Sequence, residues 1–148
     1  MKCLSLNICG TSTRKKCAWV RSLCSQNGIM FLGLQETRMV QVDLFRIKRM
    51  WGNCQFDFAV SCARGRSGGI FSVWDTTIFK KKRLWCTPNV VIVEGVWVAE
   101  SFPCFMVNVY ALQSIVQKRE LWAYLTAFFN RNNGNYIVFG DFNAVREA

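Results

Sequence analysis

The sequence predicts an α/β fold, a sandwich built on a mixed sheet with helices on one face, and three observations lead to that prediction. Segments with strand character outnumber segments with helical spacing, in the order β α β α β β β β α β. Hairpins mix with helical crossovers along that order, which favours a mixed sheet over a doubly wound parallel one. Hydrophobic residues make up 51% of the chain and aromatic residues 14%, which is ample material for a core.

In the first half of the chain, apolar runs alternate with helical periodicity. Four strands are predicted there, at residues 3–8, 29–34, 56–62 and 70–74. Two stretches have helical spacing, at residues 11–28 and 42–51. Thr11 to Thr13 can cap the first of these helices, and Gly28 can end it. The turn ARGRSGG separates the last two strands, so they are expected to form a hairpin.

In the second half, strands are predicted at residues 90–98, 105–110 and 136–140. Ser114 followed by Gln117 has the spacing of a capping box, so a helix is expected to begin there. One helical stripe contains Lys118, Trp122, Leu125 and Phe129, with Leu121 and Phe128 beside it. The basic run at residues 80–83 is interpreted as a loop, with a nuclear signal as the alternative.

The formal net charge is +10, from 19 Lys and Arg against 9 Asp and Glu. Four short runs hold 12 of these 19 cations, at residues 14–16, 46–49, 64–66 and 80–83. Clustered cations suit a polyanion, so the charge favours a nucleic-acid partner. The alternative for any one run is a solvated turn. The residues assigned to nucleic-acid binding are Arg64, Arg66, Lys80, Lys81 and Lys82.

Eight cysteines are present, but the sequence argues against a disulfide framework. The N-terminal MKCLSLNICG lacks a signal-peptide core, and no later segment is long enough to span a membrane. An intracellular chain, nuclear or cytoplasmic, keeps its thiols reduced. The chain has no C-x-x-C spacing and no histidine, so the cysteines are interpreted as buried hydrophobes and incidental exposed thiols, with a cysteine-based metal site as the lesser alternative.

Polar residues stand where the predicted strands end. They are Asn7, Gln35, Glu36, Asn108, Tyr110, Asp141 and Asn143. Taken singly, each can be an ordinary strand cap or turn residue. As a set, carboxylate and amide oxygens suit a hard cation such as Mg²⁺, and Asn and Tyr can donate hydrogen bonds to phosphate oxygens. The pattern therefore favours a metal-assisted phosphate site.

Five ordered motifs, LSLNI, FLGLQET, RSGGI, VNVYA and GDFN, resemble the signature of the endonuclease/exonuclease/phosphatase superfamily, whose fold is DNase I-like. The chain is most similar to the apurinic-type endonuclease domain of plant LINE non-LTR retrotransposons. QET and GDFN are the most specific of these motifs. The resemblance runs over essentially the whole chain and implies a sandwich of two sheets flanked by helices.

The resemblance also implies a role for each site residue. Glu36 would bind the catalytic Mg²⁺, with Mn²⁺ as the alternative ion, and Asn7 would support that metal site. Tyr110 would contact the scissile phosphate, Asp141 would orient or deprotonate the attacking water, and Asn143 would hold a phosphate oxygen. No small-molecule cofactor and no membrane partner is expected.

The sequence departs from the family pattern at three places. Cys9 stands where the apurinic-site repair branch has an acidic residue, and Leu112 replaces a proline. The family continues beyond GDFN to a Ser-Asp-His motif, whereas this chain has no histidine. Residues 1–148 are therefore interpreted as the N-terminal portion of a single domain, incomplete at the C-terminus. An uncovered apolar face is expected to make this portion sticky or unstable.

Three functions follow from the resemblance. The first is a Mg²⁺-dependent endonuclease that nicks DNA for target-primed reverse transcription, truncated and impaired here, with a missing C-terminal half or reverse transcriptase module as partner. The second is a non-catalytic remnant that binds nucleic acid. The third, a phosphatase acting on a small substrate, fits the basic charge least well.

Overall fold

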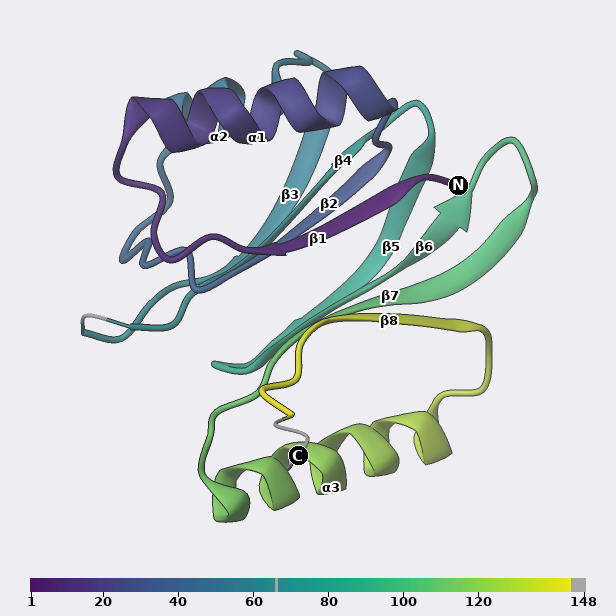
Figure 1. Ribbon diagram of the computed structural model, residues 1–148. Helices are drawn as coiled ribbons and strands as arrows, with labels where there is room; N and C mark the ends of the chain where they lie inside the picture. The colour runs from purple at the N-terminus through teal and green to yellow at the C-terminus, as the bar shows by residue number, and fades with distance from the viewer. Residues whose placement is uncertain (66, 145–148) are drawn as a thin grey trace.

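Two four-stranded sheets pack face to face in the computed structural model, and helices cover both outer faces (Figure 1). The structure describes residues 1–65 and 67–144. The first sheet has the order β1 (Cys3–Asn7), β2 (Phe31–Gln35), β4 (Ile70–Asp75), β3 (Phe56–Ser61). The second has the order β5 (Phe79–Cys86), β6 (Val90–Trp97), β7 (Phe102–Tyr110), β8 (Tyr136–Asp141). The helices are α1 (Arg14–Asn27), α2 (Leu44–Trp51) and α3 (Ile115–Arg131).

Each sheet contains one parallel pair of strands, joined by a helical crossover. β1 pairs with β2 across α1, and β7 pairs with β8 across α3, whereas the other strand pairs are antiparallel. Parallel strands end at the same edge of a sheet, so the carboxyl ends of each pair lie together. β1 and β8, the outer strands of the two sheets on this side, also contact each other.

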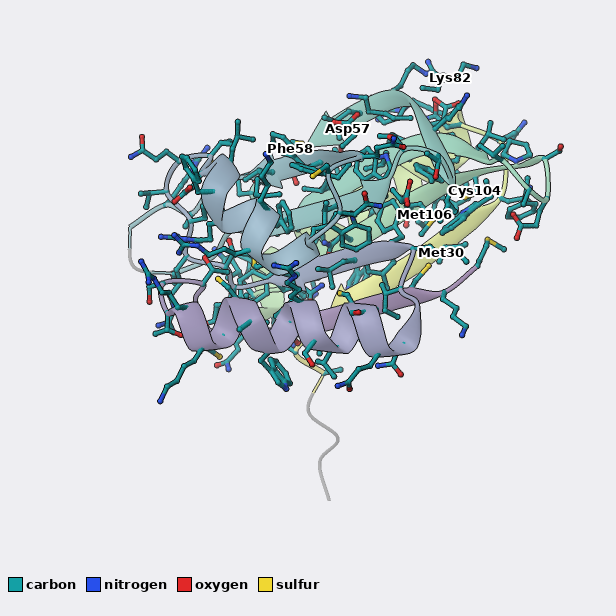
Figure 2. The ribbon with its side chains drawn as sticks, turned by 90° about the horizontal axis from the view of Figure 1, so that it is seen from above. Met30, Asp57, Phe58, Lys82, Cys104 and Met106 are labelled. Carbon is teal, nitrogen blue, oxygen red and sulfur yellow. The ribbon has the colours of Figure 1, made fainter. Side chains whose placement is uncertain are left out.

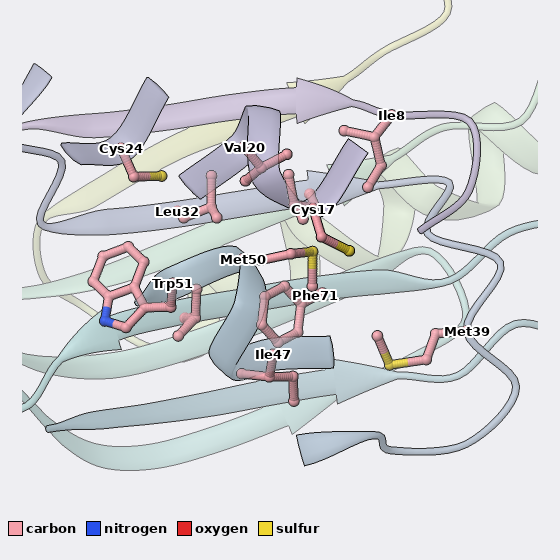
Figure 3. Close-up of a cluster of buried hydrophobic side chains, with 12 residues drawn as sticks. Ile8, Cys17, Val20, Cys24, Leu32, Met39, Ile47, Met50, Trp51 and Phe71 are labelled. Carbon is pink, nitrogen blue, oxygen red and sulfur yellow. The ribbon is translucent and has the colours of Figure 1, made fainter. Parts of the chain in front are cut away.

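Three apolar layers stabilise this arrangement, because the central strands are buried on both faces. On β2, Phe31 points into the layer between the sheets, while Leu32 and Leu34 point toward α1 and α2. Figure 3 shows the layer beneath α1 and α2. Its labelled members are Ile8, Cys17, Val20, Cys24, Leu32, Met39, Ile47, Met50, Trp51 and Phe71. On the other side, Leu121, Leu125 and Phe128 of α3 cover β6 and β7.

A polar link crosses the layer between the sheets. Gln35 on β2 donates to Asn108 Oδ1 on β7 at 2.8 Å, and Asn108 donates to the Phe71 carbonyl of β4 at 3.0 Å. Both amides are buried, so their hydrogen bonds offset the cost of removing them from water. Gly33 makes room for this link, because a Cβ atom there would clash with Phe139 and lie 3.0 Å from Asn108 Nδ2. The two sheets are therefore fixed in register close to their carboxyl ends.

The α/β sandwich is confirmed, and its second sheet corrects the predicted single sheet with helices on one face. The chain leaves the first sheet at Asp75, whose carboxylate accepts the backbone N–H of Thr77 at 2.8 Å, and β5 then begins the second sheet. The basic run at residues 80–83 lies within β5 and is not a loop. β5 forms the outer edge of its sheet, and its side chains from Lys80 to Leu84 are all exposed. It therefore lacks the alternation by which a half-buried strand is recognised. β7 also begins at Phe102, earlier than expected.

The helix ends agree with the sequence in part. Thr13 caps α1 by accepting the Lys16 backbone N–H, and Gly28 ends that helix in the left-handed conformation. Ser114 stands at the N-cap of α3 but makes no side-chain capping bond, so the predicted capping box is wrong.

The buried face of α3 differs slightly from the predicted stripe. It lies along Leu121, Leu125 and Phe128, whereas Trp122 of the predicted stripe is 41% exposed. The helix therefore packs on the second sheet with one narrow apolar side. Among the described residues, none of the helices has the length and the apolar character needed to cross a bilayer.

All eight cysteines are free thiols in the described part of the chain, and three of them are buried: Cys17, Cys24 and Cys104. Figure 2 shows Cys104 beside Met106, in the interior of the molecule, and their sulfur atoms lie 3.6 Å apart. Desolvation by burial raises the pKa of the Cys24 and Cys104 thiols to about 11. Both thiols therefore remain protonated at neutral pH and act as small apolar side chains.

Candidate active site

Two side chains that are 134 positions apart in the sequence meet where the two sheets touch. Asn7, the last residue of β1, donates from Nδ2 to Asp141 Oδ2 at 2.6 Å, and Asp141 is the last residue of β8. The strand registers place Gln35 beside Asn7 and Tyr110 beside Asp141. Because Glu36 follows Gln35, the carboxyl ends of both parallel pairs contribute polar groups to one cluster.

The loop after β1 fixes the orientation of Asn7. The backbone N–H of Cys9 donates to Asn7 Oδ1 at 3.2 Å, so the amide must turn its NH₂ group toward Asp141. The Cys9 thiol lies 3.4 Å from Asn7 Oδ1 and 3.8 Å from Glu36 Oε2, which places it between these two side chains. Lys16 of α1 donates to the carbonyls of Ile8 and Cys9, both at 2.9 Å, and ties this loop to the helix.

Glu36 lies on a backbone that glycine usually occupies. Its φ is +54° and that of Arg38 is +55°, a region that costs about 1 kcal/mol or more for a residue with a side chain. The turn before β4 holds this segment, since the Gly69 and Gly68 carbonyls accept the backbone N–H groups of Thr37 and Arg38 at 3.1 and 2.9 Å. A Cβ atom at Gly69 would clash with the Thr37 hydroxyl. Gly68 and Gly69 therefore support the backbone that follows Glu36.

The Glu36 carboxylate is 19% exposed and accepts a hydrogen bond from Arg38, whose guanidinium nitrogen lies 3.1 Å from Oε1. Arg38 is 48% exposed, so its guanidinium stands at the surface of the cluster. The other carboxylate oxygen, Oε2, faces the Cys9 thiol. Glu36 thus presents a carboxylate that is held in place by Arg38 and is only partly exposed to solvent.

Tyr110 ends β7 and is 9% exposed. Asn89 holds its backbone in place, by accepting the Tyr110 N–H at 2.9 Å and donating to its carbonyl at 3.0 Å. Burial, followed by the negative charges of Glu36 and Asp141, raises the pKa of the Tyr110 hydroxyl above its ordinary value. Tyr110 therefore remains a neutral hydrogen-bond donor at neutral pH.

The GDFN segment is held by α3 and by its own backbone. The Asn143 N–H donates to Asp141 Oδ1 at 3.0 Å, and the Asn143 side chain donates to the Ala111 carbonyl. Lys118 of α3 donates to the Asn143 carbonyl at 2.6 Å, and Trp122 of α3 stacks on Phe142 with the ring centroids 5.9 Å apart. Both oxygens of Asp141 accept a hydrogen bond, so its carboxylate has a fixed direction.

A hollow of about 570 Å³ opens beside this cluster and is lined by Asn7, Gln35, Asp141 and Asn143, among others. The donors around it are carboxylate and amide oxygens, which suit a hard cation with several water ligands. In the described part of the chain, no three acidic, cysteine or histidine side chains form a closed metal cage. The arrangement fits an ion held by one or two carboxylates together with water and a phosphate group.

The five residues predicted for catalysis and metal binding lie at this one end of the molecule. The residues predicted to contact nucleic acid do not all lie near them. Arg64 lines a hollow of about 170 Å³ together with Tyr110, so it lies close to the cluster. Arg66 is outside the described residues. Lys80 pairs with Val96, whereas Val90 at the other end of β6 pairs with Val109, so Lys80 lies near the opposite end of the sheet.

Three of the basic side chains on β5 form ion pairs. Lys81 lies 3.3 Å from Asp57 of β3, and Lys82 lies 3.9 Å from Glu94 of β6. Arg83 contacts the same Glu94 at 2.6 Å. Figure 2 shows Lys82 at the periphery of the molecule.

Three residues that build the cluster were not predicted from the sequence: Lys16, Arg38 and Lys118. Cys9 was noted only as a departure from the family pattern, without its contacts to Asn7 and Glu36. Arg38 could have been found, because it lies two residues from Glu36 in the motif QETR. The contacts of Cys9 depend on its left-handed backbone, with φ at +50°, which the sequence does not reveal.

A family model described as the endonuclease/exonuclease/phosphatase family matches residues 4–148. Comparison with curated protein sequences found no match. Among solved structures, TDP2 from C. elegans is similar with a TM-score of 0.67 and 17% identity, over 97% of this chain and 48% of that one. The AP endonuclease LMAP from Leishmania major gives 0.70 and 14%, over 94% and 54%. A functionally unknown conserved protein from Enterococcus faecalis gives 0.73 and 12%, over 97% and 67%.

The chain spans about half the length of the first of these structures. At identities this low, the similarity shows that the fold is shared.

Proposed function

This chain belongs to the endonuclease/exonuclease/phosphatase family, and from that premise we propose that it is a metal-dependent phosphodiesterase that nicks DNA. One observation carries the proposal: Asn7, Glu36, Tyr110, Asp141 and Asn143 come together at one end of the two sheets. Carboxylates beside neutral hydrogen-bond donors suit a phosphodiester bound next to a cation.

Enzymes of this family generally depend on a divalent metal, and the donors of this cluster fit one. We propose Glu36 as the main ligand, with Asn7 supporting the site and Mg²⁺ as the ion, Mn²⁺ being the alternative. When bound, such an ion would neutralise the phosphate and stabilise the charge that develops during displacement.

We propose a separate role for each of the other residues of the cluster. Asp141 accepts a proton from the attacking water or orients it, because Asn7 and Asn143 fix the direction of its carboxylate. Tyr110 donates a hydrogen bond to a phosphate oxygen without adding charge, since its raised pKa keeps the hydroxyl protonated. Asn143 can donate its second amide hydrogen to another phosphate oxygen.

The net charge of +10 supports a polyanionic substrate, and Arg64 is the predicted cation that lines a hollow together with Tyr110. Arg66, Lys80, Lys81 and Lys82 remain proposed contacts to the DNA backbone. The motifs quoted from the sequence favour the retrotransposon branch, so we propose target nicking that leaves a 3′-hydroxyl for reverse transcription, in the nucleus. We also propose that residues 1–148 form the N-terminal portion of a longer domain.

The test is a nicking assay on supercoiled plasmid with Mg²⁺. Glu36→Gln and Asp141→Asn remove one charge each at nearly constant volume, so each should lower the nicking rate by on the order of 100-fold. Glu120→Gln, on the exposed face of α3, is the matched control and should nick like the unsubstituted chain. Equal nicking by all three variants would contradict the proposal.

One observation favours a second candidate, a non-catalytic remnant that binds nucleic acid. The chain contains no histidine, so no imidazole is available within it for proton transfer. The remnant predicts DNA binding that weakens steeply with salt and no nicking with either Mg²⁺ or Mn²⁺. A phosphatase would instead hydrolyse a small phosphomonoester in an assay where the plasmid stays intact.

A further inference from the structure

A row of apolar side chains stands in water immediately after the candidate metal ligand Glu36. Val40, Val42, Leu44 and Phe45 are 61%, 48%, 54% and 80% exposed. Together with Arg38 and Arg46, they line a hollow of about 620 Å³, which we call the 38–46 groove. Single exposed apolar residues are ordinary, but four of them along one groove indicate a binding surface.

The backbone of the groove is fixed, because buried side chains anchor the segment at both ends. Met39 is 1% exposed and Ile47 is 0% exposed, and both pack in the layer beneath α1 and α2. Asp43 caps α2 by accepting the Arg46 backbone N–H at 3.1 Å. The exposed face of Phe45 is therefore presented by a segment whose backbone is fixed.

An arginine lies at each end of the groove, and each one is paired with a carboxylate. Arg38 contacts Glu36 at 3.1 Å. Arg46 donates to the Thr11 hydroxyl at 3.2 Å and lies 3.8 Å from an Asp43 carboxylate oxygen. Ser12 lines the groove, and Arg14 and Lys15 follow it in the exposed first turn of α1. Neither of these two cations forms an ion pair with a described residue, so both are open to an anion.

We infer that the 38–46 groove binds an unpaired nucleotide of the DNA strand, next to the phosphate held at the candidate active site. This inference rests on the proposed function and adds a substrate class to it, namely DNA with unstacked bases. Phe45 offers a flat aromatic face to a base, and base stacking is a main source of affinity for single strands. Arg14 and Lys15, which form no ion pair with a described residue, complement a flanking phosphate, and Arg38 joins the groove directly to Glu36.

The test measures binding of the full chain to labelled oligonucleotides in EDTA, where no cleavage can occur. Three probes are compared by fluorescence anisotropy: a single strand, a duplex with one unpaired base, and a fully paired duplex. Phe45→Ala should weaken binding of the first two probes by on the order of ten-fold, and binding of the paired duplex by less than about two-fold. Phe45→Trp, which keeps the aromatic face, should restore the affinity.

Ile115→Ala is the matched control, because Ile115 is 68% exposed at the start of α3 and lies outside the groove. It should bind all three probes like the unsubstituted chain. Phe45 is largely exposed, so an unchanged thermal unfolding midpoint of Phe45→Ala would show that any loss of binding comes from the groove. A quench of 2-aminopurine at the unpaired position, lost in Phe45→Ala, is the second expected result.

Three outcomes of the binding assay would overturn the inference: single-strand binding unaffected by Phe45→Ala, equal loss for paired and unpaired probes, or no single-strand binding by the unsubstituted chain. Self-association that depends on Phe45, without an effect on DNA binding, would also overturn it and make the groove an interface between copies. The binding assay contains no metal, so its result is independent of nicking. Groove-dependent binding without nicking would contradict the proposed function and leave the inference standing.

Discussion

Cys9 places a sulfur atom, a soft metal ligand, among the oxygen atoms of the cluster, which are hard metal ligands. Its sulfur lies 3.4 Å from Asn7 Oδ1 and 3.8 Å from Glu36 Oε2. Mg²⁺ prefers oxygen ligands, so a thiol at this position contributes little to holding that ion. The identity of residue 9 should therefore set how tightly the cluster binds Mg²⁺.

We predict that Cys9→Asp strengthens Mg²⁺ binding, by roughly ten-fold. The added carboxylate supplies an oxygen ligand, and without the ion it repels Glu36, so Mg²⁺ should raise the unfolding temperature of the variant more than that of the unsubstituted chain. Differential scanning fluorimetry with Mg²⁺ and with EDTA measures both effects. Cys54→Asp, at an exposed thiol outside the cluster, is the control. A Mg²⁺ response of Cys9→Asp no larger than that of the control would refute the prediction.

At the residue scale, the candidate site could be located from the sequence because its residues stand at the ends of predicted strands. The convergence of Asn7, Glu36 and Asp141 could be predicted, because carboxyl ends of parallel strands meet and the motifs mark those ends. The role of each neighbouring side chain could not be predicted. Lys118 reaches the Asn143 carbonyl from the start of α3, a contact that depends on how the helix sits on the second sheet.

The elements are stabilised unequally at their ends. The Thr13 hydroxyl accepts the Lys16 backbone N–H at 3.3 Å at the start of α1, whereas Ser114 at the start of α3 makes no such bond. The two residues occupy the same position of two long helices. They therefore form a matched pair for measuring what a capping bond contributes in this fold.

We predict that Thr13→Ala lowers the free energy of unfolding by about 1 kcal/mol, because it leaves a backbone N–H without its partner. Ser114→Ala should change that free energy by only a few tenths of a kcal/mol. Urea denaturation followed by circular dichroism gives both values. A loss for Ser114→Ala equal to that for Thr13→Ala would show that the capping bond is not the cause.

At the element scale, periodicity predicts the strands that are buried and misses the one that is not. β2 and β4 are apolar runs, and the predicted strands match them within a few residues. β5 has the sequence FKKKRLWC, and its charges are held by partners on other strands: Asp57 for Lys81, and Glu94 for Lys82 and Arg83. Such pairing across strands is a tertiary property, so the local sequence indicates a loop.

At the scale of the whole molecule, the two sheets pack on each other, α1 and α2 pack on the first sheet, and α3 packs on the second, so the central strands are covered on both faces. The expected sticky character of the chain stays a prediction, and an edge strand is where it can be tested. In the described part of the chain, β8 pairs with β7 alone, and Val138 on β8 is 42% exposed. An edge strand with unpaired backbone groups can add a strand from another molecule.

We predict that the chain associates through β8 as its concentration rises, and that Val138→Lys weakens this association by roughly ten-fold or more, since charges on an edge strand oppose pairing. Sedimentation velocity over a range of concentrations measures it. Ile115→Lys adds the same charge at an exposed site on α3 and should leave association unchanged. Equal effects of the two substitutions would mean that net charge, and not the edge, governs association.

The hydrogen bond between Asn7 and Asp141 also determines when the cluster can assemble during protein synthesis. These partners lie 134 positions apart, so during synthesis the ribosome must release nearly all of the described chain before they can meet. A nascent chain carries Glu36 early but cannot orient Asp141 until β8 has docked beside β7. A contact this distant in sequence also requires the closure of a long loop, which has an entropic cost. Unfinished copies of the protein would therefore have no assembled cluster with which to act on a phosphodiester.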